Sequence, residues 1–311
     1  MLRSFLLNWI SARYSKEVKD RIYEAAAETL GAAMSADEPD STEGVRRAEV
    51  GFLFSRGAEY GCFTDRMENP RITKGNGFTF VQGEYKGIPL AVAETGAGET
   101  NVREGTLALL QVFQPRRVIA SGFADALSPE IGRQEVFMPL ELVSERGERL
   151  NLSGEERGNA DNPGTGGEMP WQIAPLVSVS KLPADPEGRR ELGRKSGARL
   201  ADTLVWNAAS VCREANVPFL ALKVVAAELG DRLPPDLSRA EKAGSGSRAR
   251  RLGAFLGTFT NRPSSLVDVY KIKQRELESA DRLADHLAGL LDEISRNRSL
   301  LIEWGEERKR I

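Results

Sequence analysis

The chain has 311 residues, which is enough for one large α/β domain with helical additions. Its 43 lysines and arginines nearly balance 45 aspartates and glutamates, and the net charge of -2 argues against a nucleic-acid partner. Two distant cysteines and one histidine, His286, are too few for a disulfide framework, a metal cluster or a Ser-His-Asp triad, so we expect a cytoplasmic protein without a metal.

The N-terminal segment, residues 2–10, carries apolar residues at the spacing of one helix face. It lacks the long apolar centre and the cleavage site of a signal peptide, and no apolar run of the chain reaches the roughly 20 residues that span a bilayer. An amphipathic helix could lie on a membrane surface, but we expect a helical extension over residues 1–34 that docks on protein. Residues 35–47 then form an exposed linker.

Strand and helix patterns alternate over the main domain, which we place at residues 48–245. Short apolar runs predict strands, including a hairpin that turns at residues 85–87, and two stretches carry helical spacing. The strand segments are 48–55, 77–95, 117–122, 136–143, 177–180, 199–202 and 218–225, and the helical ones are 101–113 and 204–215. This alternation predicts an α/β fold with right-handed crossovers in a largely parallel sheet.

Two further regions complete the expected organisation. Residues 144–169 are polar and rich in glycine, which predicts an exposed, irregular insertion. Residues 246–311 predict C-terminal helices packed on the domain, the last of them long and starting at Ser264. An apolar stripe along this helix favours packing against the sheet, with a second subunit as the alternative. Together with the N-terminal helix, it leads us to expect a homodimer.

Four segments carry a resemblance to a known family: VGFLFSRGAEY, GIPLAVAETGAGETN, RRVIASGFADAL and VCREANVPFLALKVV. Their order and spacing over about residues 49–230 resemble the nucleoside phosphorylase superfamily, in particular methylthioadenosine/S-adenosylhomocysteine nucleosidases and hopanoid-associated phosphorylases. The resemblance implies a three-layer α/β/α domain with a central mixed sheet. It also implies cleavage of the N-glycosidic bond of a purine nucleoside, of adenosine type, with water or phosphate as co-substrate and no other cofactor.

Cleavage of this bond passes through a ribosyl cation, so an enzyme needs a donor at purine N7, contacts to the ribose hydroxyls and an activated nucleophile. The resemblance places Glu59 where nucleosidases have the glutamate that activates water. A carboxylate in a half-closed cleft can have its pKa raised toward neutrality, as a general base requires. The alternative is an ordinary loop glutamate.

Two further blocks are expected to contact the substrate. The turn Thr95-Gly96-Ala97-Gly98 joins a strand to a helix, so its N–H groups could bind phosphate or the ribose, although glycine can also serve the turn alone. Phe123 and Ala124 could line the base. Asp125 replaces an expected glycine and brings a negative charge into a crowded place.

The remaining family positions have lost their chemistry. The ribose-binding Met-Glu falls on Thr203-Leu204, and only Asp202, just before it, keeps an acidic residue. The Ser-Asp pair that donates to N7 falls on Ala226-Ala227, and alanine cannot donate a proton. Lys223 replaces an arginine.

The resemblance therefore leaves two hypotheses. One is an active enzyme with Glu59 as base and a relocated acid, either Asp125 or Glu228 next to the lost pair, although a one-residue shift on a strand reverses the face. The other is a non-catalytic protein that binds a nucleoside-like ligand or serves assembly. Loss of the acid and the ribose carboxylate favours slow or absent turnover.

Overall fold

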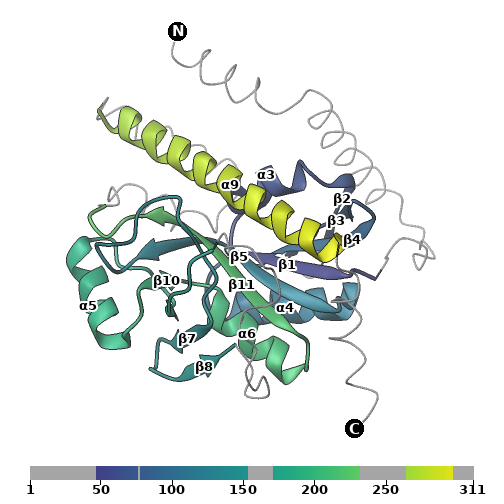
Figure 1. The fold of residues 1–311 in the computed structure, drawn as a ribbon, viewed down its shortest axis with the longest axis horizontal. Helices are drawn as coiled ribbons and strands as arrows, with labels where there is room; N and C mark the ends of the chain where they lie inside the picture. Colours follow the sequence, from purple (N-terminus) through teal and green to yellow (C-terminus); the bar gives the residue numbers. More distant parts are fainter. Residues whose placement is uncertain (1–46, 76–77, 153–170, 232–263, 297–311) are drawn as a thin grey trace.

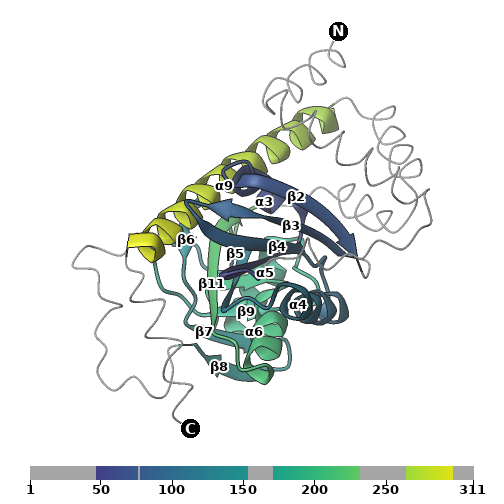
Figure 2. The same cartoon turned by 90° about the vertical axis from the view of Figure 1, so that its right-hand side faces the viewer.

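The computed structural model describes residues 47–75, 78–152, 171–231 and 264–296. The predicted N-terminal helix and linker, most of the polar insertion, and residues 232–263 lie outside the described residues. The described part forms one mixed sheet of eleven strands with helices on both faces (Figures 1 and 2). Within it, no helix combines the length and apolar character needed to cross a membrane. The predicted α/β class is confirmed.

Four parallel strands form the centre of the sheet. These are β1 (Val50–Phe54), β4 (Ile88–Glu94), β5 (Arg117–Ala126) and β11 (Phe219–Ala227). Every residue of β1 is buried, which fits a strand covered on both faces, because a parallel sheet has no solvent face. Since these strands are parallel, their carboxyl ends meet at one edge, where ligands of open α/β sheets usually bind.

The other strands extend the sheet on either side. The expected hairpin is β3 (Phe78–Tyr85) with β4, and β2 (Glu68–Gly75) pairs antiparallel with β3. Strand β2 was not predicted, because its mostly polar residues show no alternation of apolar and polar side chains. The remaining strands are β6 (Val136–Phe137), β7 (Glu141–Ser144), β8 (Arg149–Asn151), β9 (Leu176–Ser178) and β10 (Leu200–Asp202).

Two expected segments differ from the structure. The single strand predicted over residues 136–143 is two strands, β6 and β7, because Pro139 between them has no N–H for a continuous ladder. The insertion predicted from residue 144 begins instead as a hairpin in which β7 pairs with β8. Gly147 in its turn has a φ of 86°, which favours glycine.

Helices cover the sheet in two layers (Figure 2). Helices α4 (Glu99–Phe113) and α6 (Val205–Glu214) pack on one face and share one core cluster with the sheet. Helices α3 (Gly57–Thr64) and α9 (Ser264–Arg296) pack on the other face. Residues of the apolar stripe on α9 are buried there: Ala280, Leu283, Ala284, Leu287 and Leu291. This part of the stripe therefore packs on the chain's own body.

Helix α5 (Pro186–Ser196) was missed by the periodicity of the sequence because its residues are mostly charged. Its capping signals are nevertheless standard. Asp185 accepts a hydrogen bond from the Gly188 N–H, Pro186 occupies the first turn and Gly197 ends the helix in the left-handed conformation. These signals could have located the helix, whose Arg189 pairs with Asp125 of β5.

Candidate active site

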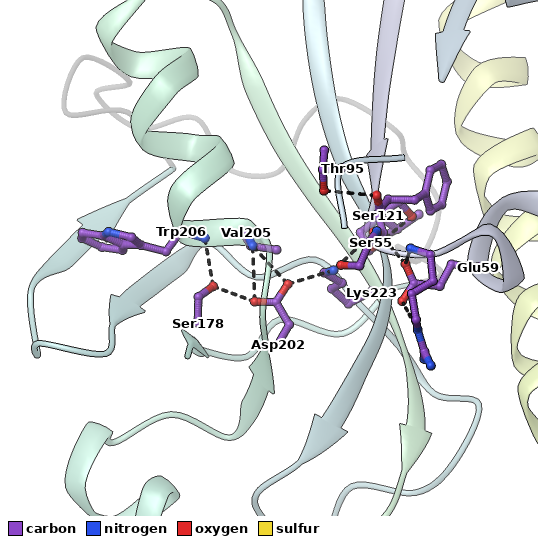
Figure 3. Close-up of polar contacts among 12 residues, drawn as sticks. Ser55, Glu59, Thr95, Ser121, Ser178, Asp202, Val205, Trp206 and Lys223 are labelled. Carbon is purple, nitrogen blue, oxygen red and sulfur yellow. Dashed lines mark hydrogen bonds and ion pairs between the residues drawn. The ribbon is translucent and has the colours of Figure 1, made fainter. Parts of the chain in front are cut away.

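Glu59 lies at the carboxyl end of the central sheet, in the first turn of α3 directly after β1 (Figure 3). Its residual exposure is 4%, and its Oε2 accepts hydrogen bonds from the N–H groups of Ser55 at 2.9 Å and Arg56 at 3.3 Å. The carboxylate also contacts Gly122 of β5, where an added Cβ would lie 2.6 Å from Oε2. Glu59 is thus fixed at the junction of β1 and β5.

The electrostatic surroundings of Glu59 suit a general base. Burial raises the pKa of its carboxyl above the ordinary value, while Arg56, Lys223 and the two N–H donors lower the pKa by smaller amounts. A base is most effective when its pKa approaches the working pH. Arg56 lies 3.7 Å from Glu59 and is 44% exposed, so the carboxylate has one cation on its solvent side.

The side chain of Arg56 connects this site to two neighbours. Its guanidinium lies 5.6 Å from the ring centroid of Phe123, within the range of a cation–π contact. It also pairs with Glu276 of α9 at 3.4 Å. The predicted base-lining residues, Phe123 and Ala124, are both buried on β5. Glu59, Arg56 and Phe123 therefore meet at one edge of the sheet.

The turn at Thr95 lies beside the end of β1. The N–H of Thr95 donates to the carbonyl of Phe54 at 2.9 Å, and its hydroxyl donates to the same oxygen at 3.3 Å. Gly96 and Gly98 have φ values of 77° and 96°, so both positions favour glycine whether or not a ligand binds. The structure brings this turn to the same edge as Glu59 (Figure 3).

A buried chain of polar contacts runs from the Glu59 region toward α6 (Figure 3). Lys223, 1% exposed, places its Nζ 2.9 Å from Asp202 Oδ2 and donates to the Ser121 carbonyl at 3.2 Å. Asp202 also accepts from the Val205 N–H at 3.1 Å and from the Ser178 hydroxyl at 2.6 Å. Since Asp202 stabilises the start of α6 and pairs with Lys223, its contacts are internal.

Asp125 lies near the end of β5 and is paired with an arginine from α5. Its Oδ2 is 3.1 Å from Arg189 Nε, and the Arg189 side chain has no exposed surface. Burial raises the pKa of Asp125 to about 6, and Arg189 is the main opposing influence. The negative charge that the sequence placed in a crowded region is therefore matched by a cation that no motif had indicated.

The other candidate positions give no second carboxylate near Glu59. The Glu228 carboxylate is 48% exposed and accepts from the Arg133 N–H at 3.1 Å. Ala226 and Ala227 are half-buried, and Leu204 is fully buried in the core under α4 and α6. A glutamate at position 204 would bury a charge in this core. Within the described ranges, no cluster of three or more His, Cys, Asp or Glu could hold a metal.

We expect Gly122→Ala to destabilise the fold and displace Glu59. Gly122 has a φ of 123°, and the new methyl would overlap the Glu59 carboxylate, so strain and overpacking together should cost about 2–4 kcal/mol. Gly147→Ala is the matched control, since Gly147 also has a positive φ but nothing lies within 4 Å of its Cβ position. Urea unfolding of both variants measures the difference. Equal losses would show that the contact with Glu59 is loose.

The chain is similar to known proteins over the part that carries this site. The model of the phosphorylase superfamily matches residues 54–208, about half of the chain, a range that starts at the last residue of β1 and includes α3, the Thr95 turn and β5. The chain belongs to the phosphorylase superfamily. The matched range begins at the end of β1, just before Glu59, and extends beyond Asp202.

Curated relatives in this superfamily match a limited stretch. The 5'-methylthioadenosine/S-adenosylhomocysteine nucleosidase of Pseudoalteromonas translucida is 28% identical over 93 residues, which cover 30% of this chain and 40% of the relative. The protein of that name from Chromohalobacter salexigens is 24% identical over 94 residues, with the same coverage. The match thus spans less than half of each relative.

Solved structures extend the similarity to the whole fold. A Campylobacter jejuni 5'-methylthioadenosine/S-adenosyl homocysteine nucleosidase has a TM-score of 0.57 at 11% identity, covering 79% of this chain and 99% of its own. A futalosine hydrolase mutant of Helicobacter pylori has a TM-score of 0.55 at 16% identity, with coverage of 79% and 99%. At such identities the likeness shows a shared fold, and the three-layer α/β/α domain with a central mixed sheet, which the resemblance implied, is confirmed.

Proposed function

We propose that this chain hydrolyses the N-glycosidic bond of a purine nucleoside, of adenosine type, with Glu59 as the general base. The observation that carries the proposal is the buried Glu59 carboxylate, fixed against Gly122 at the carboxyl edge of β1 and β5. A desolvated carboxylate of raised pKa can take a proton from a water molecule as it attacks the sugar. The names of the matched relatives, which are nucleosidases, support the same class of reaction.

Water fits this site better than phosphate. A buried carboxylate repels a phosphate anion, whereas it accepts a proton from neutral water. The buried ammonium near Glu59, that of Lys223, is already paired with Asp202 at 2.9 Å and does not supply an uncompensated positive charge. The Thr95 turn is then a contact for the ribose, with glycine required by its backbone conformation.

A non-catalytic nucleoside-binding or assembly role is the second candidate. The observation that favours it is that Asp202, Lys223 and Glu228 all have internal partners. Leu204 and Ala227, moreover, carry no polar side-chain atom for the ribose or the base. Two surface hollows do not include Glu59: one lies beside Trp206 and Arg213, and the other beside Arg133 and His286.

The homodimer stays a prediction of the sequence.

Adenine release from 5'-methylthioadenosine and S-adenosylhomocysteine in phosphate-free buffer tests the proposal. We expect release with stoichiometric free sugar, at a rate below the ordinary range of ~1–10 per second, because Leu204 cannot grip the ribose hydroxyls. Dependence on phosphate, with a sugar phosphate as product, would contradict the choice of water. Tight binding of either nucleoside by calorimetry without any release would establish the second candidate.

A further inference from the structure

The register of the central strands places Asp125 beside the position that lacks an acid. Asp125 on β5 is the Cα partner of Ala227 on β11, at the carboxyl ends of both strands. It follows Gly122, which contacts Glu59, by three residues, or roughly 10 Å along a strand that rises about 3.3 Å per residue. The two positions are thus separated along β5 by about the length of a ribose with its base, and Arg56 acts electrostatically on both carboxyls.

Asp125 is held by a buried arginine of α5. Arg189 is fully buried, and its Nη1 donates to the carbonyls of Glu228 at 3.1 Å and Asp231 at 2.7 Å. Its Nε contacts Asp125, whose side chain keeps 12% exposure. The guanidinium has no exposed surface, whereas the Asp125 side chain keeps a small exposed fraction, so Arg189 approaches the carboxyl from the protein interior. Arg189 thereby fixes the orientation of the Asp125 carboxyl from its buried side.

We propose that Asp125 is the proton donor to the leaving base, with Arg189 as its positioning residue. This inference rests on the hydrolysis proposed above. It differs from the alternative at Glu228, whose carboxylate is directed to the Arg133 N–H and is half exposed. Asp125 on β5 would thus supply the acid in place of Ala227, its partner on the neighbouring strand β11.

The step balances as an ordinary hydrolysis. The bond between the anomeric carbon and the base nitrogen breaks, and its electron pair goes to the base, which takes a proton from Asp125. Water forms the new C–O bond and gives a proton to Glu59. Solvent then returns one proton to Asp125 and removes one from Glu59, so the net products are the free base and the free sugar.

The titration of the two carboxyls supports these roles. Burial raises the pKa of Asp125 to about 6, so part of the population carries a proton near neutral pH. The rate should fall as pH rises through this value, because the acid form of Asp125 is lost. It should fall at low pH as Glu59 becomes protonated. A bell-shaped profile follows. The charged groups that act on Asp125 are Arg189, Arg56 and Asp231.

A pair of substrates tests the assignment. 5'-Methylthioadenosine needs a proton on its leaving base, whereas a 4-nitrophenyl riboside releases a stable anion and does not. We expect Asp125→Asn to lower adenine release about 10²- to 10⁴-fold, the usual contribution of a general acid, and nitrophenol release less than about threefold. Arg189→Gln removes the opposing cation, so it should move the alkaline limb of the adenine profile to higher pH.

Each outcome decides the question. Equal losses on both substrates, or no loss on either, overturn Asp125 as the acid and leave the hydrolysis intact. If the unchanged protein releases neither base nor nitrophenol, the proposed function fails, and the acid assignment fails with it. Should Asp125→Asn not fold, the unchanged protein still decides: its alkaline limb must appear with 5'-methylthioadenosine and be absent with the nitrophenyl riboside.

Discussion

Glu59→Gln should strongly slow nucleoside hydrolysis and leave the fold at least as stable as before. Loss of a general base typically lowers the rate about 10²- to 10⁴-fold. The amide oxygen of glutamine can still accept from the Ser55 and Arg56 N–H groups. Steady-state adenine release and urea unfolding at pH 7 measure the two effects. Lost activity with unchanged or higher stability is typical of a functional carboxylate that strains the fold. Replacement of a purely structural carboxylate would instead lower the stability of the protein.

The stability difference between Glu59→Gln and the unchanged protein should depend on pH. Burial raises the pKa of Glu59 in the folded state, so ionisation costs the folded chain more than the unfolded one. Its contribution to stability is present below the ordinary carboxyl pKa and is lost as pH rises through the folded pKa. The Gln variant should therefore gain on the unchanged protein as pH rises. Glu49→Gln, at the amino end of β1, is a control that should leave activity intact.

Lys223→Met should cost about 3–5 kcal/mol of unfolding free energy, because it leaves the buried Asp202 carboxylate without its cation. The methionine fills a similar volume, so lost packing contributes little. Asp202→Asn leaves Lys223 unpaired and should cost a similar amount. The double variant should recover part of the loss, because neither partner then remains as an unpaired buried charge.

An exposed ion pair provides the control for Lys223. Lys195 is 68% exposed and lies 3.3 Å from Glu191 on α5, so Lys195→Met should cost less than about 1 kcal/mol. Urea unfolding of all four variants at constant pH gives the comparison. If Lys223→Met costs no more than Lys195→Met, the buried pair does not stabilise the sheet edge, and the role of Asp202 is confined to the start of α6.

Local sequence was sufficient for most of the fold. Continuous apolar runs predicted β1, β5 and β11, and helical spacing predicted α4 and α6, because both patterns depend on which residues must be buried. Helix α5 and strand β2 were missed because their residues are mainly polar. In the first case, Asp185, Pro186 and Gly197 were signals that a search for caps would have found.

The sequence by itself determined the α/β class, the likeness to a family and the position of Glu59, since these depend on the order and spacing of residues along the chain. Only the tertiary structure decided the partners of the buried charges. Arg189 reaches Asp125 across 64 residues, and Lys223 pairs with Asp202 from β11, the strand that follows α6 in the sequence. No local pattern encodes such contacts, because an ion pair depends on distance in space and on exclusion of water, and both arise only when the sheet is assembled.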